Sequence, residues 1–185
     1  MPSRRFILSL FGALLFLLSF RKRPAMASIF FKPKKKVKPR TPSDLFTEGD
    51  KALVGAAGNG TVKEMIKEAV SSIGGFERLN IKDKTVLVKP NCVSGEKNPA
   101  TTNPEVVKAT VEILYEQGAK KVYVGDMSAL ATISTVRNMK RNGIKKAAED
   151  AGAEVIVFED YDWVEVELPG ALYIDKAYVT EWIYN

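Results

Sequence analysis

The chain has 185 residues and the composition of a globular protein, which is enough for one domain with additional segments. Residues 1–40 hold 11 of the 28 Lys and Arg residues and no acid, so the remaining residues carry 17 basic against 22 acidic side chains. Since the basic excess belongs to the tail, we expect no nucleic-acid partner. The chain has no His, which excludes His-based catalysis and the usual zinc sites within it. It has a single Cys, so it cannot hold a four-Cys iron–sulfur cluster alone.

Residues 1–27 are predicted to be an export signal. Ser3, Arg4 and Arg5 precede an apolar run over 6–20, and a basic stretch and a small-x-small cleavage pattern follow it. A helical run of this size spans about 22 Å, short of the roughly 30 Å hydrocarbon core, which favours a cleaved signal over a membrane span. The Arg pair resembles the twin-arginine signal; an ordinary secretory signal, an uncleaved anchor and a cytoplasmic apolar N-terminus are the alternatives. We therefore expect an exported, periplasmic protein, or one attached to the membrane through an uncleaved signal.

Residues 28–43 are rich in Lys and Pro. Such a segment buries no core, so it is predicted to be an extended linker. Attraction of its lysines to anionic lipid head groups is the alternative, and membrane contact is expected only through this segment or the signal.

The body of the chain, residues 44–185, begins with a predicted strand over 51–54, a Gly-rich turn over 55–60 and an amphipathic helix over 61–72. A Gly-rich turn between a strand and a helix can bind phosphate. Its glycine spacing is neither the dinucleotide fingerprint nor a P-loop, however, so a plain turn is favoured.

The stretch 85–104 organises the body. Residues 85–88 are apolar and β-branched, as in a strand covered on both faces, and Pro90 ends that strand. After a loop, Asn103 is a good N-cap and Pro104 suits the first helical position. The strand end and the helix start should therefore share the edge of a sheet where ligands bind in α/β proteins.

The remaining pattern continues the alternation of strands and helices. We expect a helix from Pro104 to the residues before Gly118, a strand over 121–124, a helix over 133–151 broken near Gly143, a strand over 154–158 and a half-exposed strand over 163–168. This order predicts an α/β fold with an open, mostly parallel sheet and helices on both faces, in Rossmann-like layers.

Lys89 and Asp126 are the candidate catalytic residues. Each follows a predicted strand at its carboxyl end, where Lys89 could pair with an anionic ligand and Asp126 could act as a general base or bind a divalent cation. The alternatives are a surface Lys and a turn or helix cap.

The candidate ligand-binding residues are Asn91, Thr101, Thr102 and Asn103, whose amides and hydroxyls could orient an anion or could form turn and cap hydrogen bonds. Cys92 could be a thiol of lowered pKa, although a buried, inert Cys is favoured. A last group could bind a hard cation, although a solvated acidic turn is favoured: Glu159, Asp160 and Asp162.

Several segments together resemble the amino-terminal half of the domain of unknown function 362 family: residues 86–91, 100–107, 124–126, 142–144 and 147–152. The family pattern ordinarily continues with another strand and Lys-rich motifs, so we expect this chain to be incomplete at its C-terminus or to be a natural truncation. Two large aromatic and two aliphatic residues lie within 179–184, next to the end of the sequence, and they also indicate that a partner element is missing.

The resemblance also implies a redox setting, because members of the family carry twin-arginine signals or are joined to iron–sulfur modules. We therefore expect an exported α/β protein that is either an iron–sulfur- or redox-associated enzyme or a binding protein for an anionic small molecule. An iron–sulfur electron-transfer protein is a candidate partner. A non-catalytic binding or assembly module that needs a partner chain is the alternative. Neither the cofactor nor the reaction follows from the sequence.

Overall fold

The computed structural model describes residues 32–40, 45–128 and 133–184. These residues form two compact units, of which the smaller combines residues 32–40 with 161–184 and the larger spans residues 45–160. No helix within the described ranges is long and apolar enough to cross a membrane. The predicted export signal lies outside these ranges.

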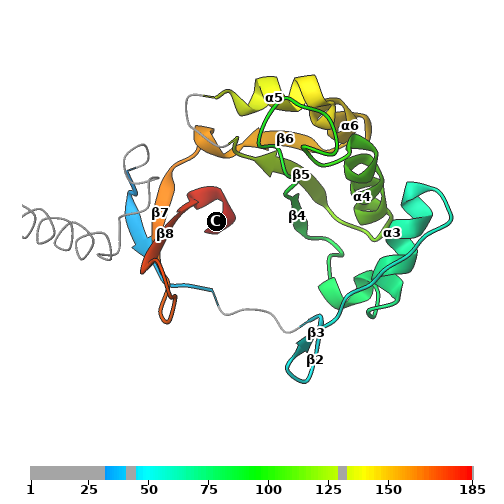
Figure 1. Ribbon diagram of the computed structural model, residues 1–185, viewed down its shortest axis with the longest axis horizontal. Helices are drawn as coiled ribbons and strands as arrows, with labels where there is room; N and C mark the ends of the chain where they lie inside the picture. The colour runs from blue at the N-terminus through cyan, green and yellow to red at the C-terminus, as the bar shows by residue number, and fades with distance from the viewer. Residues whose placement is uncertain (1–31, 41–44, 129–132, 185) are drawn as a thin grey trace, which may run out of the picture. The chain divides into compact units, whose positions relative to one another are not determined.

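The smaller unit is a three-stranded sheet in the order β1-β7-β8, built from β1 (Lys35–Val37), β7 (Trp163–Glu167) and β8 (Lys176–Thr180), and followed by the 3-10 helix η3 (Glu181–Tyr184) (Figure 1). β1 is parallel to β7, and β7 is antiparallel to β8. The Lys-rich segment predicted to be an extended linker is thus extended, but part of it pairs as a strand.

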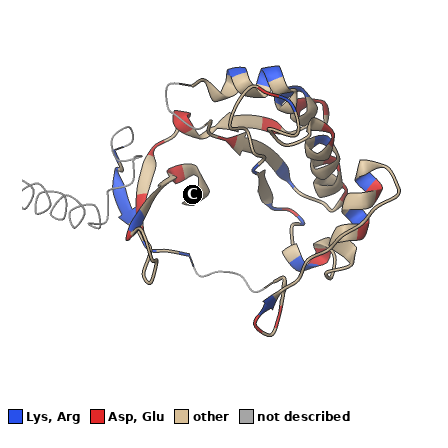
Figure 2. Ribbon diagram, viewed as in Figure 1, with Lys and Arg blue, Asp and Glu red and all other residues tan. Residues whose placement is uncertain are grey.

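Ion pairs join β1 to the acidic residues of this unit. Lys34 lies 2.6 Å from Asp162, Lys35 pairs with Glu181, and Lys36 Nζ lies 3.3 Å from Glu165 Oε1. Figure 2 shows the basic β1 beside acidic positions of the same sheet. The charged residue Glu165, expected on the exposed face of a strand, is instead buried, because Lys36 and Lys176 neutralise its carboxylate.

The larger unit contains a parallel sheet in the order β4-β5-β6, built from β4 (Thr85–Val88), β5 (Lys121–Asp126) and β6 (Glu154–Val157). Val88 lies opposite Val124, and Asp126 lies opposite Val157. The predicted α/β class with an open parallel sheet is confirmed. The 3-10 helix η2 (Phe158–Asp160) follows β6 directly.

Local sequence sets the helix ends of this unit. α4 (Pro104–Glu116) begins as predicted, with Pro104 in its first turn and the Asn103 side chain accepting a hydrogen bond from the N–H of Glu105 at 2.9 Å. α3 (Val62–Ser71) begins at a capping box in which Glu64 Oε2 accepts a hydrogen bond from the Thr61 N–H at 2.8 Å. The start of this helix, where a phosphate could have bound, is therefore occupied by a carboxylate of the chain itself. This agrees with the favoured prediction of a plain Gly-rich turn.

The predicted break near Gly143 separates α5 (Thr135–Asn142) from α6 (Ile144–Asp150). Gly143 has a φ of 90°, a conformation that a residue with a Cβ rarely adopts, so it ends one helix and redirects the chain into the next.

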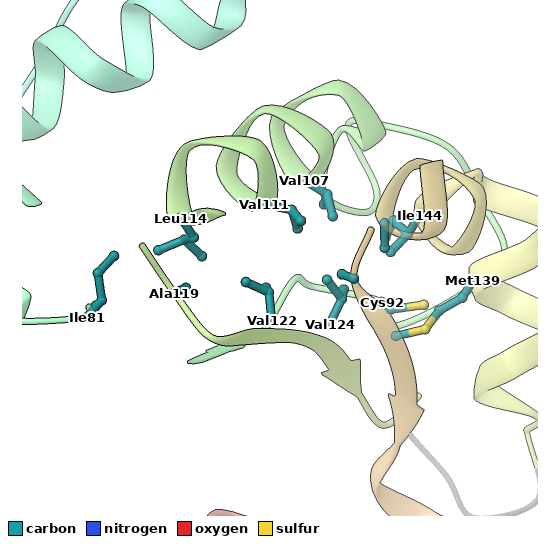
Figure 3. Packing of buried hydrophobic residues seen from close by; sticks show 12 residues of the cluster. Ile81, Cys92, Val107, Val111, Leu114, Ala119, Val122, Val124, Met139 and Ile144 are labelled. Atoms are coloured by element: carbon teal, nitrogen blue, oxygen red, sulfur yellow. The ribbon is translucent and has the colours of Figure 1, made fainter. Parts of the chain in front are cut away.

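Helices α4, α5 and α6 pack against one face of the sheet, as the side chains in Figure 3 show. The order β4-β5-β6 moves across the sheet in one direction, so right-handed crossovers place both connections on the same face. Helices were expected on both faces of the sheet, but in the described residues they pack on one face only. The core between the layers contains mostly aliphatic residues: Ile81, Cys92, Val107, Val111, Leu114, Ala119, Val122, Val124, Met139, Ile144, Ala148 and Ala153.

The predicted strand over residues 51–54 is shorter and lies outside the parallel sheet. It forms a two-stranded antiparallel hairpin of β2 (Thr47–Glu48) and β3 (Lys51–Ala52), while Val54 is 87% exposed. The three apolar residues 52–54 do not form a buried strand, because a two-stranded hairpin is too small to cover them. The 3-10 helix η1 (Phe76–Leu79) lies between α3 and β4.

Candidate functional site at the carboxyl edge of the parallel sheet

Lys89 and Asp126 meet at the carboxyl edge of the sheet. Asp126 is the last residue of β5, which is two residues longer than predicted, and Lys89 directly follows the neighbouring strand β4. Lys89 Nζ lies 2.7 Å from Asp126 Oδ1. The Lys89 side chain is 58% exposed and that of Asp126 is 6% exposed, so the pair joins a buried carboxylate to an accessible ammonium group.

The second oxygen of Asp126 holds the loop that follows β4. The backbone N–H of Cys92 donates a hydrogen bond to Asp126 Oδ2 at 2.6 Å. The Cys92 carbonyl accepts a hydrogen bond from the Ser128 hydroxyl at 2.7 Å. Residues from the ends of β4 and β5 are therefore fixed to each other by both backbone groups of Cys92, which rigidifies this edge.

Helix α5 contributes a buried polar face to the same network. The Asn138 side-chain amide donates to Ser128 Oγ at 2.8 Å, and Thr135 Oγ1 accepts from the Ser128 N–H at 2.8 Å. The Asn142 side-chain amide donates to the Ser94 carbonyl at 3.1 Å and to Cys92 Sγ at 3.4 Å. These three α5 residues were not among the site residues predicted from the sequence. Thr135, Asn138 and Asn142 are three and four residues apart, so they share a helix face with Met139, and this spacing was the signal in the sequence that could have identified them.

The four predicted ligand-binding residues lie in or next to the loop between β4 and α4. The Asn91 N–H donates to Thr102 Oγ1 at 2.8 Å, and the Asn91 carbonyl accepts from the Thr102 N–H at 3.0 Å. The buried Thr101 hydroxyl donates to the Glu96 carbonyl at 2.7 Å, and Asn103 caps α4. The structure brings these residues together through hydrogen bonds within the loop, the interactions considered as their alternative.

Cys92 is fully buried, and burial raises the pKa of its thiol above the usual value. The hydrogen bond from Asn142 lowers this pKa, but by less, and the nearby Asp126 carboxylate raises it further. The thiol therefore stays protonated at neutral pH, as expected for an inert, buried Cys.

Metal-binding residues are sparse in the described ranges, which contain no group of three or more His, Cys, Asp or Glu side chains that could hold a metal ion. A cation at Asp126 would have to displace the Lys89 ammonium group from Oδ1. In the acidic turn, Asp162 pairs with Lys34, and Glu159 Oε1 accepts a hydrogen bond from the Thr135 N–H at 3.1 Å. Among the described residues, two of the three acidic side chains of this turn therefore have a partner within the chain.

The chemistry available at this edge is that of an oriented ammonium group. Lys89 has three N–H donors, of which Asp126 accepts from one. The other two N–H groups of Lys89 can donate to a carboxylate or phosphate. Both oxygens of Asp126 are occupied, so its role is to orient Lys89.

Comparison with known proteins identifies one family. The family model described as domain of unknown function (DUF362) matches residues 86–185, which include Lys89, the loop after β4, Asp126 and α5. No curated protein and no solved structure matches the chain significantly.

Proposed function

The chain belongs to the domain of unknown function 362 family, and from this premise we propose that it binds an anionic small molecule at the carboxyl edge of β4-β5-β6. The observation that carries the proposal is the Lys89–Asp126 pair, in which a buried carboxylate holds an accessible ammonium group at the edge where α/β proteins bind ligands. Lys89 would contact the ligand, and Asp126 would act as its positioning residue.

The surrounding network supports this assignment. Both Asp126 oxygens are used, one by Lys89 and one by the Cys92 N–H, so the carboxylate has little freedom to move. Preorganised donors bind an anion better than flexible ones, since less conformational entropy is lost on binding. Asn91, Thr101, Thr102 and Asn103 would shape the loop beside Lys89 rather than donate directly.

The wider proposal is an exported, redox-associated protein of the periplasm or the membrane surface. It rests on the sequence of residues 3–27 and on the family resemblance. With one buried Cys and no His, this chain would need a partner protein, such as an iron–sulfur electron-transfer protein, to supply a cluster. A non-catalytic module that completes a partner's site is the second candidate, and the intramolecular hydrogen bonds of Asn91 and Thr101 favour it over direct catalysis by the loop.

The test compares the two ends of one strand. Lys89→Met removes the ammonium group and keeps most of the aliphatic stem, and Lys84→Met makes the same change at the exposed position before β4. Thermal unfolding of the full chain would be followed with inorganic phosphate, pyrophosphate or citrate as the probe. We expect at least one probe to raise the Tm of the parent chain and of Lys84→Met, with affinity reduced roughly tenfold or more in Lys89→Met.

Two results would overturn the proposal. One is that no probe stabilises the parent chain. The other is that Lys89→Met and Lys84→Met respond alike, which would place any anion binding elsewhere.

A further inference from the structure

Helix α5 lies in the longest basic stretch of the larger unit. Between Asp126 and Glu149 the sequence holds five Lys or Arg residues and no acid. Lys146 pairs with Asp150 at 2.5 Å, and Lys145 pairs with Glu149, so the two cations of α6 are neutralised within their own helix. The three cations of α5 remain: Arg137, Lys140 and Arg141.

These three cations lack close acidic partners. Within the described parts of the chain, the side chains of Arg137 and Lys140 make no hydrogen bond or ion pair, and Arg141 reaches only Glu96, at 3.9 Å. Other lysines of the same unit are paired: Lys63 with Glu112 and Glu116, and Lys121 with Glu154. Single lysines elsewhere in the unit, such as Lys108 and Lys120, also lack an ion pair in the described residues, but α5 groups three cations without a close acidic partner within five residues, where Figure 2 shows basic positions on the helix.

Two exposed aliphatic side chains lie in the first turn of α5 or just before it. Ile133 is 40% exposed and Val136 is 38% exposed. Val136, Arg137, Lys140 and Arg141 lie on the exposed side of α5, because Thr135, Asn138, Met139 and Asn142 are buried on the opposite side. Ile133 directly precedes Ser134, the N-cap of this helix. We call Ile133 and the four exposed α5 residues the α5 outer face.

We propose that the α5 outer face is a docking surface for a protein partner that presents carboxylates around a small apolar centre. Arginines beside exposed aliphatic side chains are typical of the central part of protein interfaces, where Arg is enriched. The charge of the face calls for an acidic partner, since unpaired cations next to one another would repel a basic surface.

Two other anionic partners fit the face less well. Residues 41–160 carry 16 Lys or Arg against 17 Asp or Glu, so the larger unit lacks the basic excess of a nucleic-acid-binding domain, and the face has no aromatic residue on which a base could stack. A helix that lies on a membrane needs a broad apolar side with large residues such as Trp, Phe or Leu, whereas this face has two partly exposed aliphatics.

The opposite side of the same helix connects this surface to the candidate site. Asn138 and Asn142 bind Ser128 and the loop at Cys92 and Ser94, and the Arg141 side chain packs against Gly95, where an added Cβ would lie 3.1 Å from Arg141 Cδ. A partner on the α5 outer face would therefore dock one helix away from Lys89 and Asp126. The proposal stands on the charge and exposure of α5 and does not depend on ligand binding at Lys89.

The test uses defined peptides and the full chain. One labelled peptide has Glu residues flanking a central pair of Leu, and its control has Gln in place of every Glu. Arg137→Gln with Lys140→Gln removes two charges from the outer face, and Lys108→Gln with Lys120→Gln removes two charges from exposed positions elsewhere in the unit. By fluorescence anisotropy we expect the acidic peptide to bind the parent chain, with affinity falling roughly tenfold in the α5 variant and less than about twofold in the control variant.

The proposal would be overturned if the acidic peptide did not bind, or if the Gln peptide bound equally well. It would also be overturned if both double variants lost the same affinity, because the net charge of the chain alone would then explain the binding. Tighter binding of anionic phospholipid vesicles or of a single-stranded oligonucleotide, with the same dependence on Arg137 and Lys140, would also overturn it, because the partner would then be a membrane or a nucleic acid. Neither variant changes Lys89, so failure here leaves the proposed ligand site untouched.

Discussion

The parallel sheet β4-β5-β6 and the mixed sheet β1-β7-β8 are both three-stranded, but different forces stabilise them. The parallel sheet packs Val122 and Val124, both fully buried, against aliphatic residues of α4 and α6. The mixed sheet surrounds the buried Glu165 with Lys36, Lys176 and the hydroxyl of Tyr178. One unit thus depends mainly on apolar burial, and the other depends in part on ion pairs.

This difference predicts different responses to solvent. Apolar burial is nearly independent of pH, whereas a charge network weakens when its carboxylates are protonated or when salt screens it. Two optical probes separate the units, because both tryptophans, Trp163 and Trp182, lie in the smaller unit and the described α-helices lie in the larger unit. Tryptophan fluorescence therefore follows one unit, and circular dichroism at 222 nm follows mainly the other.

The largest effect is expected from Ile144→Ala in the larger unit. Ile144 is fully buried in the core between α6 and the sheet, so truncation removes apolar contacts and leaves a cavity. We expect a loss of about 2–5 kcal/mol in the free energy of unfolding, measured by urea denaturation with circular dichroism. Val54→Ala, at an 87% exposed position of the same unit, should change it by less than about 0.5 kcal/mol. Similar losses in the two variants would contradict an apolar core at Ile144.

A smaller effect is expected from Ser128→Ala at the polar edge of the same unit. The Ser128 hydroxyl donates to the Cys92 carbonyl and accepts from the Asn138 amide, and removing it leaves both buried groups without that partner. We expect a loss of about 1–3 kcal/mol in the free energy of unfolding. The exposed Ser71 in α3 offers a matched Ser→Ala control, for which we expect a change within about 0.5 kcal/mol.

The single thiol gives Ser128→Ala a local readout. Cys92 is the only Cys of the chain and is fully buried, so its reaction with an alkylating reagent requires the loop to open. A faster reaction in Ser128→Ala than in Ser71→Ala would confirm that the hydroxyl holds this loop. Equal rates would show that Asp126 and Asn142 suffice to close it.

The larger unit was more predictable from sequence than the smaller one. Its strands and helices follow local patterns: the β-branched residues of β4, the cap at Asn103 and the glycine at 143 each act within a few residues. The smaller unit pairs residues 35–37 with 164–166, a separation in sequence that no local pattern reveals. The burial of Glu165 depends on that pairing, so alternation alone predicted an exposed side chain.

The candidate site shows the same division. Lys89 and Asp126 were predicted to share an edge because each follows a strand, and the structure places them 2.7 Å apart. The contributions of Asn138 and Asn142 were missed, since a short helix with three cations and two asparagines reads as a solvated surface helix. Their role depends on the loop at Cys92, which comes from a distant part of the sequence.

The effect expected to be smallest concerns the pH dependence of the mixed sheet. The hydrogen bond from Lys176 lowers the pKa of Glu165, burial opposes this shift, and Lys36 lowers the pKa further. A carboxylate whose pKa is lowered on folding stabilises the folded state above its unfolded pKa, about 4.3 for Glu, and this stabilisation is lost as pH falls through the lower folded pKa. Stability of the smaller unit should therefore change little between neutral pH and about pH 5 and should fall below that range.

Glu165→Gln tests this charge network, because the amide keeps the shape of the side chain and has no proton to gain. In tryptophan fluorescence, the variant should be less stable than the parent chain at neutral pH and should lose less stability on acidification. Glu167→Gln, at the exposed position two residues along β7, should keep the acid dependence of the parent chain. An equal acid dependence in Glu165→Gln and the parent chain would show that other carboxylates control the mixed sheet, with Asp162 and Glu181 opposite Lys34 and Lys35 as the next groups to substitute.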